Sequence, residues 1–213
     1  MIRYPDAHTH IARELPCEFD LLSIELPAAR QLDEHRCYSV GLHPWSNPAG
    51  WTDGIAQLEQ WLPLPQVRAV GECGLDKRRG ALMEMQTSLF VKQIRLAVGY
   101  KKPLILHNYK ATGEILELHA KYGDDVPWIL HGFRANVHVM EMFLKKGFYL
   151  SYGIHFNEEA LLKTPLTHLL LETDEASELE LKGLYARVAT LLKMDVAELV
   201  ELIKKNMRSL FSM

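Results

Sequence analysis

Six side chains of the kinds that bind divalent metal ions are spread along this sequence, each closing a short apolar or β-rich run. They are four histidines and two carboxylates: His8, His10, Glu72, His107, His131 and Asp174. His8 and His10 are two residues apart, so their side chains point to the same face of an extended strand. If the runs are neighbouring strands, the six groups gather in one pocket. Imidazole and carboxylate ligands together suit Zn, Mn, Co, Ni or Mg, so the pattern predicts a metal centre typical of hydrolases.

Short β-rich runs alternate with amphipathic stretches along the chain. We expect eight strands, at residues 4–9, 20–25, 36–42, 66–72, 103–107, 127–131, 147–152 and 167–172. An apolar pattern near a 3.6-residue period predicts a helix over 82–101, and Thr112, Asn136 and Asp195 are expected to cap later helices. Strands that alternate with helices predict a parallel sheet with right-handed crossovers. Eight such units predict an α/β fold of the (β/α)8 TIM-barrel type.

The length of 213 residues predicts a single domain, residues 1–213, although such barrels usually have about 250 residues. The segment between His10 and Phe19 is too short for a full crossover helix, and it also contains the helix-breaking Pro16. We therefore expect an irregular barrel with one or more helices missing. Active sites of these barrels lie at the carboxyl ends of the strands, where we expect all six candidate ligands.

Composition excludes several classes of protein. A net charge of −3 is no general nucleic-acid-binding signature, so an anionic substrate would be held by local charge. Three cysteines, Cys17, Cys37 and Cys73, have no CxxC spacing and predict neither a disulfide framework nor a cysteine zinc site. No apolar run approaches the ~20 residues of a membrane span, and the N-terminus lacks a signal-peptide core. We expect a cytoplasmic monomer with no membrane partner.

Seven motifs in order give the chain a family resemblance over almost its whole length. They are DAHTH (6–10), GLHPW (41–45), GECGLD (71–76), KPLILH (102–107), ILHGF (129–133), LLLETD (169–174) and NMRSLF (206–211). With them the chain resembles the TatD family of metal-dependent hydrolases, a branch of the amidohydrolase-like barrels. The resemblance implies two ions: one held by His8, His10 and Asp174, the other by His107 and His131, with Glu72 bridging. It also implies hydrolysis of phosphodiester bonds in DNA.

Four segments depart from the family's pattern, and all four concern substrate contacts. They are KRRGALMEMQ after Asp76, HNYK at His107, HGFRA at His131 and EASELELKG after Asp174. Within or near them, Lys110 and Arg134 each follow a ligand histidine by three residues, and we expect them to bind phosphate oxygens. His43 is expected to donate to a phosphate or a leaving group, or else to serve a structural role beside its turn proline.

These patterns predict a divalent-metal-dependent hydrolase, in first place a phosphodiesterase or deoxyribonuclease that uses a water activated by two metals. Glu72 and Asp174 are the expected catalytic residues. Asp174 acts either as the base that orients or deprotonates the water, or as a ligand only. Two alternatives remain open at this stage. One is an amidohydrolase-type hydrolase of a small ester, lactone or amide. The other is a metal-binding protein that has lost turnover.

Overall fold

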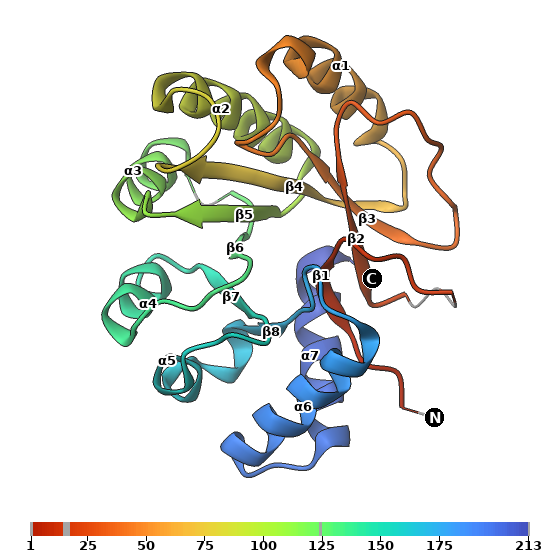
Figure 1. Cartoon of the computed structure of the whole chain (residues 1–213), viewed down its shortest axis with the longest axis vertical. Coiled ribbons are helices and arrows are strands. Elements are labelled where there is room, and N and C mark those ends of the chain that lie inside the picture. Colours follow the sequence, from red (N-terminus) through yellow and green to blue (C-terminus); the bar gives the residue numbers. More distant parts are fainter. Residues whose placement is uncertain (1, 15–17, 124, 213) are drawn as a thin grey trace.

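The computed structural model describes residues 2–14, 18–123 and 125–212, and its eight parallel strands form a nearly closed barrel (Figure 1). Each strand pairs with the next in sequence: β1 (Asp6–Thr9), β2 (Asp20–Glu25), β3 (Cys37–Gly41), β4 (Val67–Asp76), β5 (Leu104–Tyr109), β6 (Trp128–Leu130), β7 (Tyr149–Tyr152) and β8 (Leu169–Leu171). A bridge between Thr9 and Asp174 joins β1 to the segment after β8. The predicted TIM barrel is confirmed.

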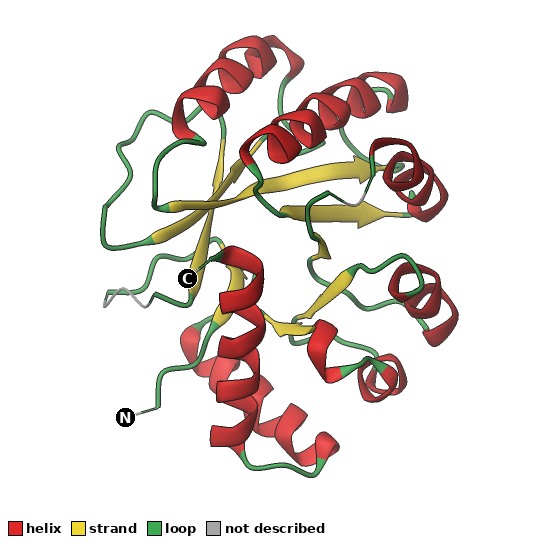
Figure 2. Cartoon of the chain, turned by 180° about the vertical axis from the view of Figure 1, so that it is seen from behind, coloured by secondary structure: helices red, strands yellow, loops and turns green. Residues whose placement is uncertain are grey.

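The helices cover only part of the barrel. They are α1 (Trp51–Trp61), α2 (Met83–Tyr100), α3 (Thr112–Tyr122), α4 (Val137–Leu144), α5 (Glu158–Lys163), α6 (Glu178–Leu192) and α7 (Val196–Phe211), with short 3-10 turns η1 (Pro48–Gly50) and η2 (Leu166–His168). Among the described residues, no helix lies between β1 and β2 or between β2 and β3. Loops alone cover that side, at the right of Figure 1 and the left of Figure 2. The expected loss of helices is confirmed, although Pro16 and Cys17 lie outside the described residues.

Two of the three expected helix caps are present. Asn136 accepts a hydrogen bond from the backbone N–H of Val139, and Asp195 forms a capping box with Glu198. The prediction for Thr112 is wrong, because Thr112 is the first residue of α3 and its cap position is taken by Ala111. The hydroxyl of Thr112 instead lies 3.2 Å from the side-chain nitrogen of Asn108.

The strands are buried on both faces, as expected for a parallel sheet covered by helices. Val40, Val70, Ile105, Leu150 and Leu170 are completely buried within one continuous apolar core. Close packing of this kind holds backbone positions tightly, so side chains at the strand ends are carried by a rigid scaffold. None of the helices that the structure describes is long and apolar enough to span a membrane.

Strand β4 continues further than predicted, and this changes the position of Glu72. The strand extends to Asp76, so Glu72 lies within it and not at its end. The pairing of β4 with β5 shifts between Val70 and Cys73, a bulge that re-aims the intervening side chains. Next to it, Gly74 has φ +132°, and a Cβ there would lie 2.2 Å from the carbonyl oxygen of His107. The prediction that all six candidate ligands lie at strand ends is therefore wrong for Glu72, and also for His107, because β5 continues two residues beyond it to Tyr109.

Where the first crossover helix is missing, an arginine on the loop ties the strands together. Arg13 donates to Asp20 of β2 at 2.8 Å and to Asp6 of β1 at 3.2 Å. Arg36 donates in turn to the backbone carbonyl of Arg13 at 2.7 Å. Asp6 also accepts from the backbone N–H and the hydroxyl of Thr173, which follows β8. This polar cluster closes the barrel between its first and last strands.

Asp20 makes stability depend on pH. Burial raises its pKa to about 7 despite the charge of Arg13, above the ~3.9 of an exposed aspartate. Because the folded state holds this proton more tightly than the unfolded chain, ionised Asp20 opposes folding, and its cost grows as pH rises from about 4 to about 7. We expect the stability of Asp20→Asn, relative to wild type, to increase over that range by about 4 kcal/mol, or about 1.4 kcal/mol per pKa unit. Urea unfolding in EDTA measures the free energy of unfolding of the variant and the wild type at each pH, and Asp53→Asn, a change at an exposed residue, is the control. If the difference between Asp20→Asn and wild type did not change with pH, the prediction would be contradicted.

Candidate metal centre

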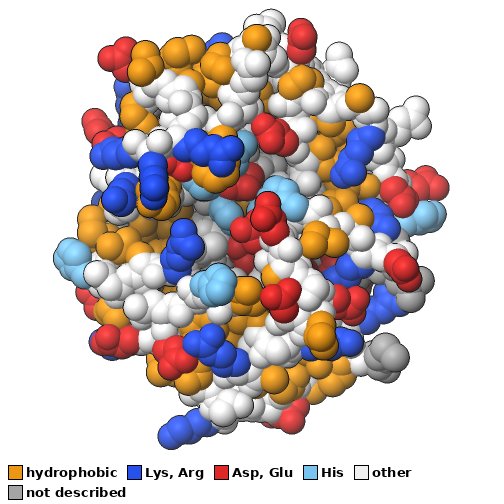
Figure 3. Space-filling view, in the orientation of Figure 1, with side chains coloured by type: hydrophobic (Ala, Val, Ile, Leu, Met, Phe, Trp, Pro, Cys, Tyr) orange, Lys and Arg blue, Asp and Glu red, His pale blue; other side chains and the backbone are white. Residues whose placement is uncertain are grey.

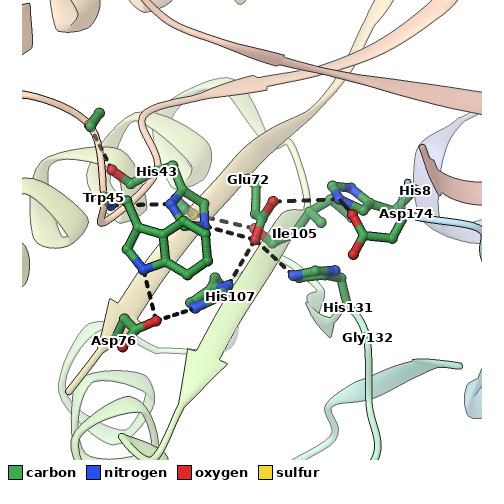
Figure 4. Close-up of polar contacts among 12 residues, drawn as sticks. His8, His43, Trp45, Glu72, Asp76, Ile105, His107, His131, Gly132 and Asp174 are labelled. Carbon is green, nitrogen blue, oxygen red and sulfur yellow. Dashed lines mark hydrogen bonds and ion pairs between the residues drawn. The ribbon is translucent and has the colours of Figure 1, made fainter. Parts of the chain in front are cut away.

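The carboxylate of Glu72 lies at the centre of the site, with a ring nitrogen of each of five histidines within 3.5 Å of it. Figure 4 shows four of them, His8, His43, His107 and His131, around the carboxylate. Oε2 lies 3.5 Å from Nε2 of both His8 and His10. Oε1 is the nearer oxygen for the other three: His43 Nε2 at 3.0 Å, His107 Nδ1 at 3.0 Å and His131 Nε2 at 2.7 Å. Glu72 is only 7% exposed. One buried carboxylate thus contacts side chains from β1, β5 and the loops that follow β3 and β6.

Backbone pairing holds Asp174 against the first two histidines. Its N–H donates to the carbonyl of His8 at 3.0 Å, and the N–H of His10 donates to the carbonyl of Asp174 at 2.9 Å. Asp174 has φ +58°, a left-handed conformation that non-glycine residues seldom adopt outside tight turns and functional sites. Its Oδ1 lies 3.8 Å from Nε2 of His8 and 3.5 Å from Nε2 of His10. The six predicted ligands therefore meet in one place.

His107 and His131 each have a second carboxylate behind them. His107 contacts Glu72 through Nδ1, and its Nε2 lies 2.9 Å from Asp76. The Nδ1 of His131 lies 3.3 Å from Glu172, leaving Nε2 toward Glu72. A carboxylate on one ring nitrogen leaves the lone pair of the other free for a metal, an arrangement common around metal-bound histidines. Sequence analysis assigned no role to Asp76 and Glu172, although both lie within the motifs GECGLD and LLLETD.

His43 is held in the opposite way. Its Nδ1 accepts a hydrogen bond from the backbone N–H of Trp45 at 3.1 Å, so the proton of the neutral ring is on Nε2. That Nε2–H donates to Glu72. His43, Glu72 and His107 have ligand atoms close enough to share an ion. A protonated Nε2 has no lone pair to give, however, so the hydrogen bonds make His43 a donor.

The site fits a metal ion on the evidence of a buried histidine. Within the described part of the chain, neither ring nitrogen of His8 has a hydrogen-bond partner, although both are buried. A buried polar atom without a partner is costly, and a cation between His8, Glu72 and Asp174 would remove the cost. His8, His10 and Glu72 form one group with metal-binding spacing, and His8, His131 and Asp174 form another.

The cluster of opposite charges shifts several pKa values. Burial would raise the pKa of Glu72, but the charge of His131 and hydrogen bonds from the surrounding histidines hold it well below its usual range. Burial would lower the pKa of His131, but Glu72 and Glu172 together raise it well above the ordinary value. The hydrogen bond to Glu72 also raises the pKa of His10. Glu72 and the histidines around it thus favour each other's charged forms.

The histidines open into a cavity of about 560 Å³. Lys110 and Arg134, the predicted phosphate-binding residues, lie along its wall and are exposed. Trp45 and Tyr109 also line it. The predicted site residues thus line one opening, except His8, which is completely buried.

Comparison with known proteins places this chain in a family. The family model described as TatD related DNase matches residues 22–212. The chain belongs to this family. Its barrel is also similar to the crystal structure of a TatD homologue from Escherichia coli K12, with a TM-score of 0.75 and 22% identity over 91% of this chain and 86% of that one. That likeness concerns the fold.

Two curated relatives carry functional names. A protein named 3'-5' ssDNA/RNA exonuclease TatD, from Cronobacter turicensis, is 36% identical over 85 residues, 38% of this chain and 32% of that protein. An uncharacterized metal-dependent hydrolase from Bacillus subtilis is 26% identical over 194 residues, 81% of this chain and 76% of that protein. The chain spans about a third of the length of the first curated relatives it matches.

Metal binding should depend on pH, because an ion must displace the protons that Glu72 holds on His10 and His131. Both histidines have raised pKa values, so competition by protons extends above the ordinary histidine range. As the pH rises, we expect the Mn²⁺ dissociation constant to fall by up to about tenfold per pH unit for each proton displaced. Calorimetry in two buffers of different ionisation enthalpy measures the protons released; an affinity that does not change with pH would refute this.

Glu172 should support metal affinity without touching the ion. It is completely buried, and Oε1 contacts Nδ1 of His131 and accepts from the N–H of Gly132. Glu172→Gln keeps the shape but loses the charge that fixes the ring, so metal affinity should fall about tenfold. Equilibrium dialysis measures the change. Glu178→Gln, an exposed change in the same segment of chain, is the control; equal affinities of the two variants would show that Glu172 has no such role.

Proposed function

We propose that this chain is a divalent-metal-dependent phosphodiesterase that cleaves nucleic-acid strands with a water activated by two ions. The observation that carries the proposal is the buried carboxylate of Glu72 with five histidine nitrogens around it. The name of the Cronobacter relative, an exonuclease on single-stranded DNA and RNA, supports nucleic acid as the substrate. All of these side chains come from one chain, so the proposed reaction needs no second copy.

The proposed ligands divide into two sets that share Glu72. His8, His10 and Asp174 would hold one ion, and His107 and His131 the other. The nitrogen-rich donors favour Zn, Mn, Co or Ni, although two-metal phosphoryl enzymes also use Mg. When bound, the ions would supply a water of lowered pKa and neutralise charge on the phosphoryl group. Asp76 and Glu172 would fix the imidazole rings of the second set.

Asp174 is the proposed general base. Its side chain is 45% exposed toward the opening, whereas Glu72 is enclosed by histidines. A carboxylate in that position can accept a proton from an attacking water and release it to solvent. The left-handed backbone and the pairing with His8 and His10 keep the carboxylate in place.

Three further residues would act on the substrate. The Nε2–H of His43 donates to Glu72, so it lies at the base of the site, and a phosphate oxygen or the leaving group would take this proton in place of Glu72. Lys110 and Arg134 stand higher on the cavity wall, where their charges would bind phosphate oxygens. These roles require only the positions and protonation states described above.

Purified protein loaded with Mn²⁺, Zn²⁺, Co²⁺ or Mg²⁺ should hydrolyse bis(p-nitrophenyl) phosphate and lose that activity in EDTA. It should bind about two ions by elemental analysis, and Glu72→Ala should lose most of them together with at least about 99% of the activity. Circular dichroism of Glu72→Ala tests whether the fold survives.

Parallel assays with p-nitrophenyl acetate and a lactone panel separate the alternatives. Ester or lactone turnover without phosphodiester turnover would replace the proposal with an amidohydrolase-type reaction. Bound metal with every substrate inert would indicate a metal-binding protein without turnover. Absence of bound metal under full loading would refute the proposed centre.

A further inference from the structure

Two arginines at the rim, outside the metal centre, are held by aromatic side chains that line the cavity. The guanidinium of Arg79 lies 4.1 Å from the ring centre of Trp45, and that of Arg78 lies 3.5 Å from the hydroxyl of Tyr109. Stacking and hydrogen bonding of this kind restrict the side chain and leave other N–H donors of the guanidinium free. Both aromatic residues line the cavity above Glu72.

Hydrogen bonds to two buried side chains hold the loop that carries these arginines. Asp76, which is 3% exposed, accepts from the backbone N–H groups of Arg78 and Arg79 at 2.7 and 2.9 Å. Gln86, which is 1% exposed, accepts from the N–H of Asp76, and its side-chain nitrogen lies 2.7–3.1 Å from the carbonyls of Asp76, Arg79 and Ala81. A loop that merely carried charge for solubility would not need these buried partners.

The same aspartate connects the loop to the metal centre. The second oxygen of Asp76 lies 2.9 Å from Nε2 of His107 and accepts from the indole N–H of Trp45 at 2.8 Å. The ring centres of Trp45 and His107 are 5.2 Å apart. Asp76 therefore fixes the distance between the two arginines and the candidate metal ligands.

The charge of the two arginines is available to a ligand. Lys77 beside them is paired with Glu114, whereas in the described part of the chain Arg78 and Arg79 form no salt bridge. Figure 3 shows Lys and Arg side chains gathered beside the central histidines, over the side where α2 and α3 lie, while acidic side chains lie in and across the opening. The hydrogen bond from Arg78 lowers the pKa of Tyr109, and the charges of Lys110 and Arg134 add to that effect. This side of the opening is thus strongly cationic.

We propose that Arg78 and Arg79 form a subsite for a phosphate of the nucleic-acid strand other than the phosphate being cleaved. This inference rests on the proposed function. The two residues do not line the cavity above Glu72, but Trp45 and Tyr109, which hold them, do. The guanidinium groups therefore lie beside the cavity, where they would meet a neighbouring phosphate and not the one at the metal centre. The strand then approaches over β4 and β5 and away from the acidic residues after β8. A substrate with one phosphate cannot use this subsite.

The first test compares substrates with one phosphate and with several. For an oligothymidylate, Arg78→Ala and Arg79→Ala should each lower kcat/KM by about three- to tenfold, mainly through KM. For bis(p-nitrophenyl) phosphate the loss should be much smaller. Tyr109→Phe, which removes only the hydroxyl that contacts Arg78, should reproduce part of the Arg78→Ala effect. Arg79→Lys should fall between wild type and alanine, because lysine keeps the charge but not the planar stacking.

A second test needs no turnover. Fluorescence anisotropy of a labelled oligothymidylate in EDTA, at several salt concentrations, should give a slope of log affinity against log salt that falls by about 0.7 for each arginine removed. Arg95→Ala is the matched control, since Arg95 lies over Tyr122 with its guanidinium 5.8 Å from the ring and does not line the cavity. It should leave both measurements unchanged.

The outcomes separate the subsite from the proposed function. If wild type hydrolyses phosphodiesters while the arginine variants match Arg95→Ala on the oligonucleotide, the subsite is refuted and the function stands. Equal losses on both substrates would likewise refute the subsite, because the arginines would then act on the metal centre. If nothing is hydrolysed but strand binding depends on the arginines, the subsite stands and the phosphodiesterase proposal fails. Failure of the wild type to bind the strand would refute the subsite.

Discussion

Burial of one negative charge, that of Glu72, is the constraint on which the rest of the site depends. Moving a carboxylate from water into the protein interior costs free energy unless cations or hydrogen-bond donors surround it. Here five imidazoles do so. The rings of His43, His107 and His131 are in turn fixed by a backbone N–H or a carboxylate further out. The charge of Glu72 in turn raises the pKa values of His10 and His131. An ion that replaced those protons would meet a site already arranged for positive charge.

The hydrogen-bond partner on the ring nitrogen that faces away from Glu72 decides what three of the histidines can do, although the sequence does not distinguish them. His107 and His131 each direct one nitrogen to a carboxylate and keep the other for the centre of the site. His43 receives a backbone N–H on one nitrogen and so carries its proton on the other. The first two are suited to bind metal and His43 to donate a proton. Asp76 connects the metal centre to its surroundings, because it contacts both His107 and the loop with the two arginines.

The barrel positions the site although two of its connections contain no described helix. Two connections, after β1 and after β2, contain no described helix, and the polar cluster around Arg13 joins β1, β2 and the segment after β8 in their place. The seam it closes is where Asp174 pairs with His8 and His10. The same seam therefore completes the barrel and brings a candidate ligand near the end of the chain to two candidate ligands near its beginning.

The sequence alone determined the barrel, the missing helices, the family and the ligand types, because strand periodicity, helix punctuation and motif order are local properties of the chain. Tertiary structure decided what depends on contacts between distant segments. Glu72 lies inside β4 because the strand goes on pairing with β5 as far as Asp76. Thr112 is not a cap because Asn108 and Ala111 form the preceding turn. Which nitrogen of a histidine is free, and which arginine of a charged run is held in place, depend on partners that no spacing in the sequence reveals.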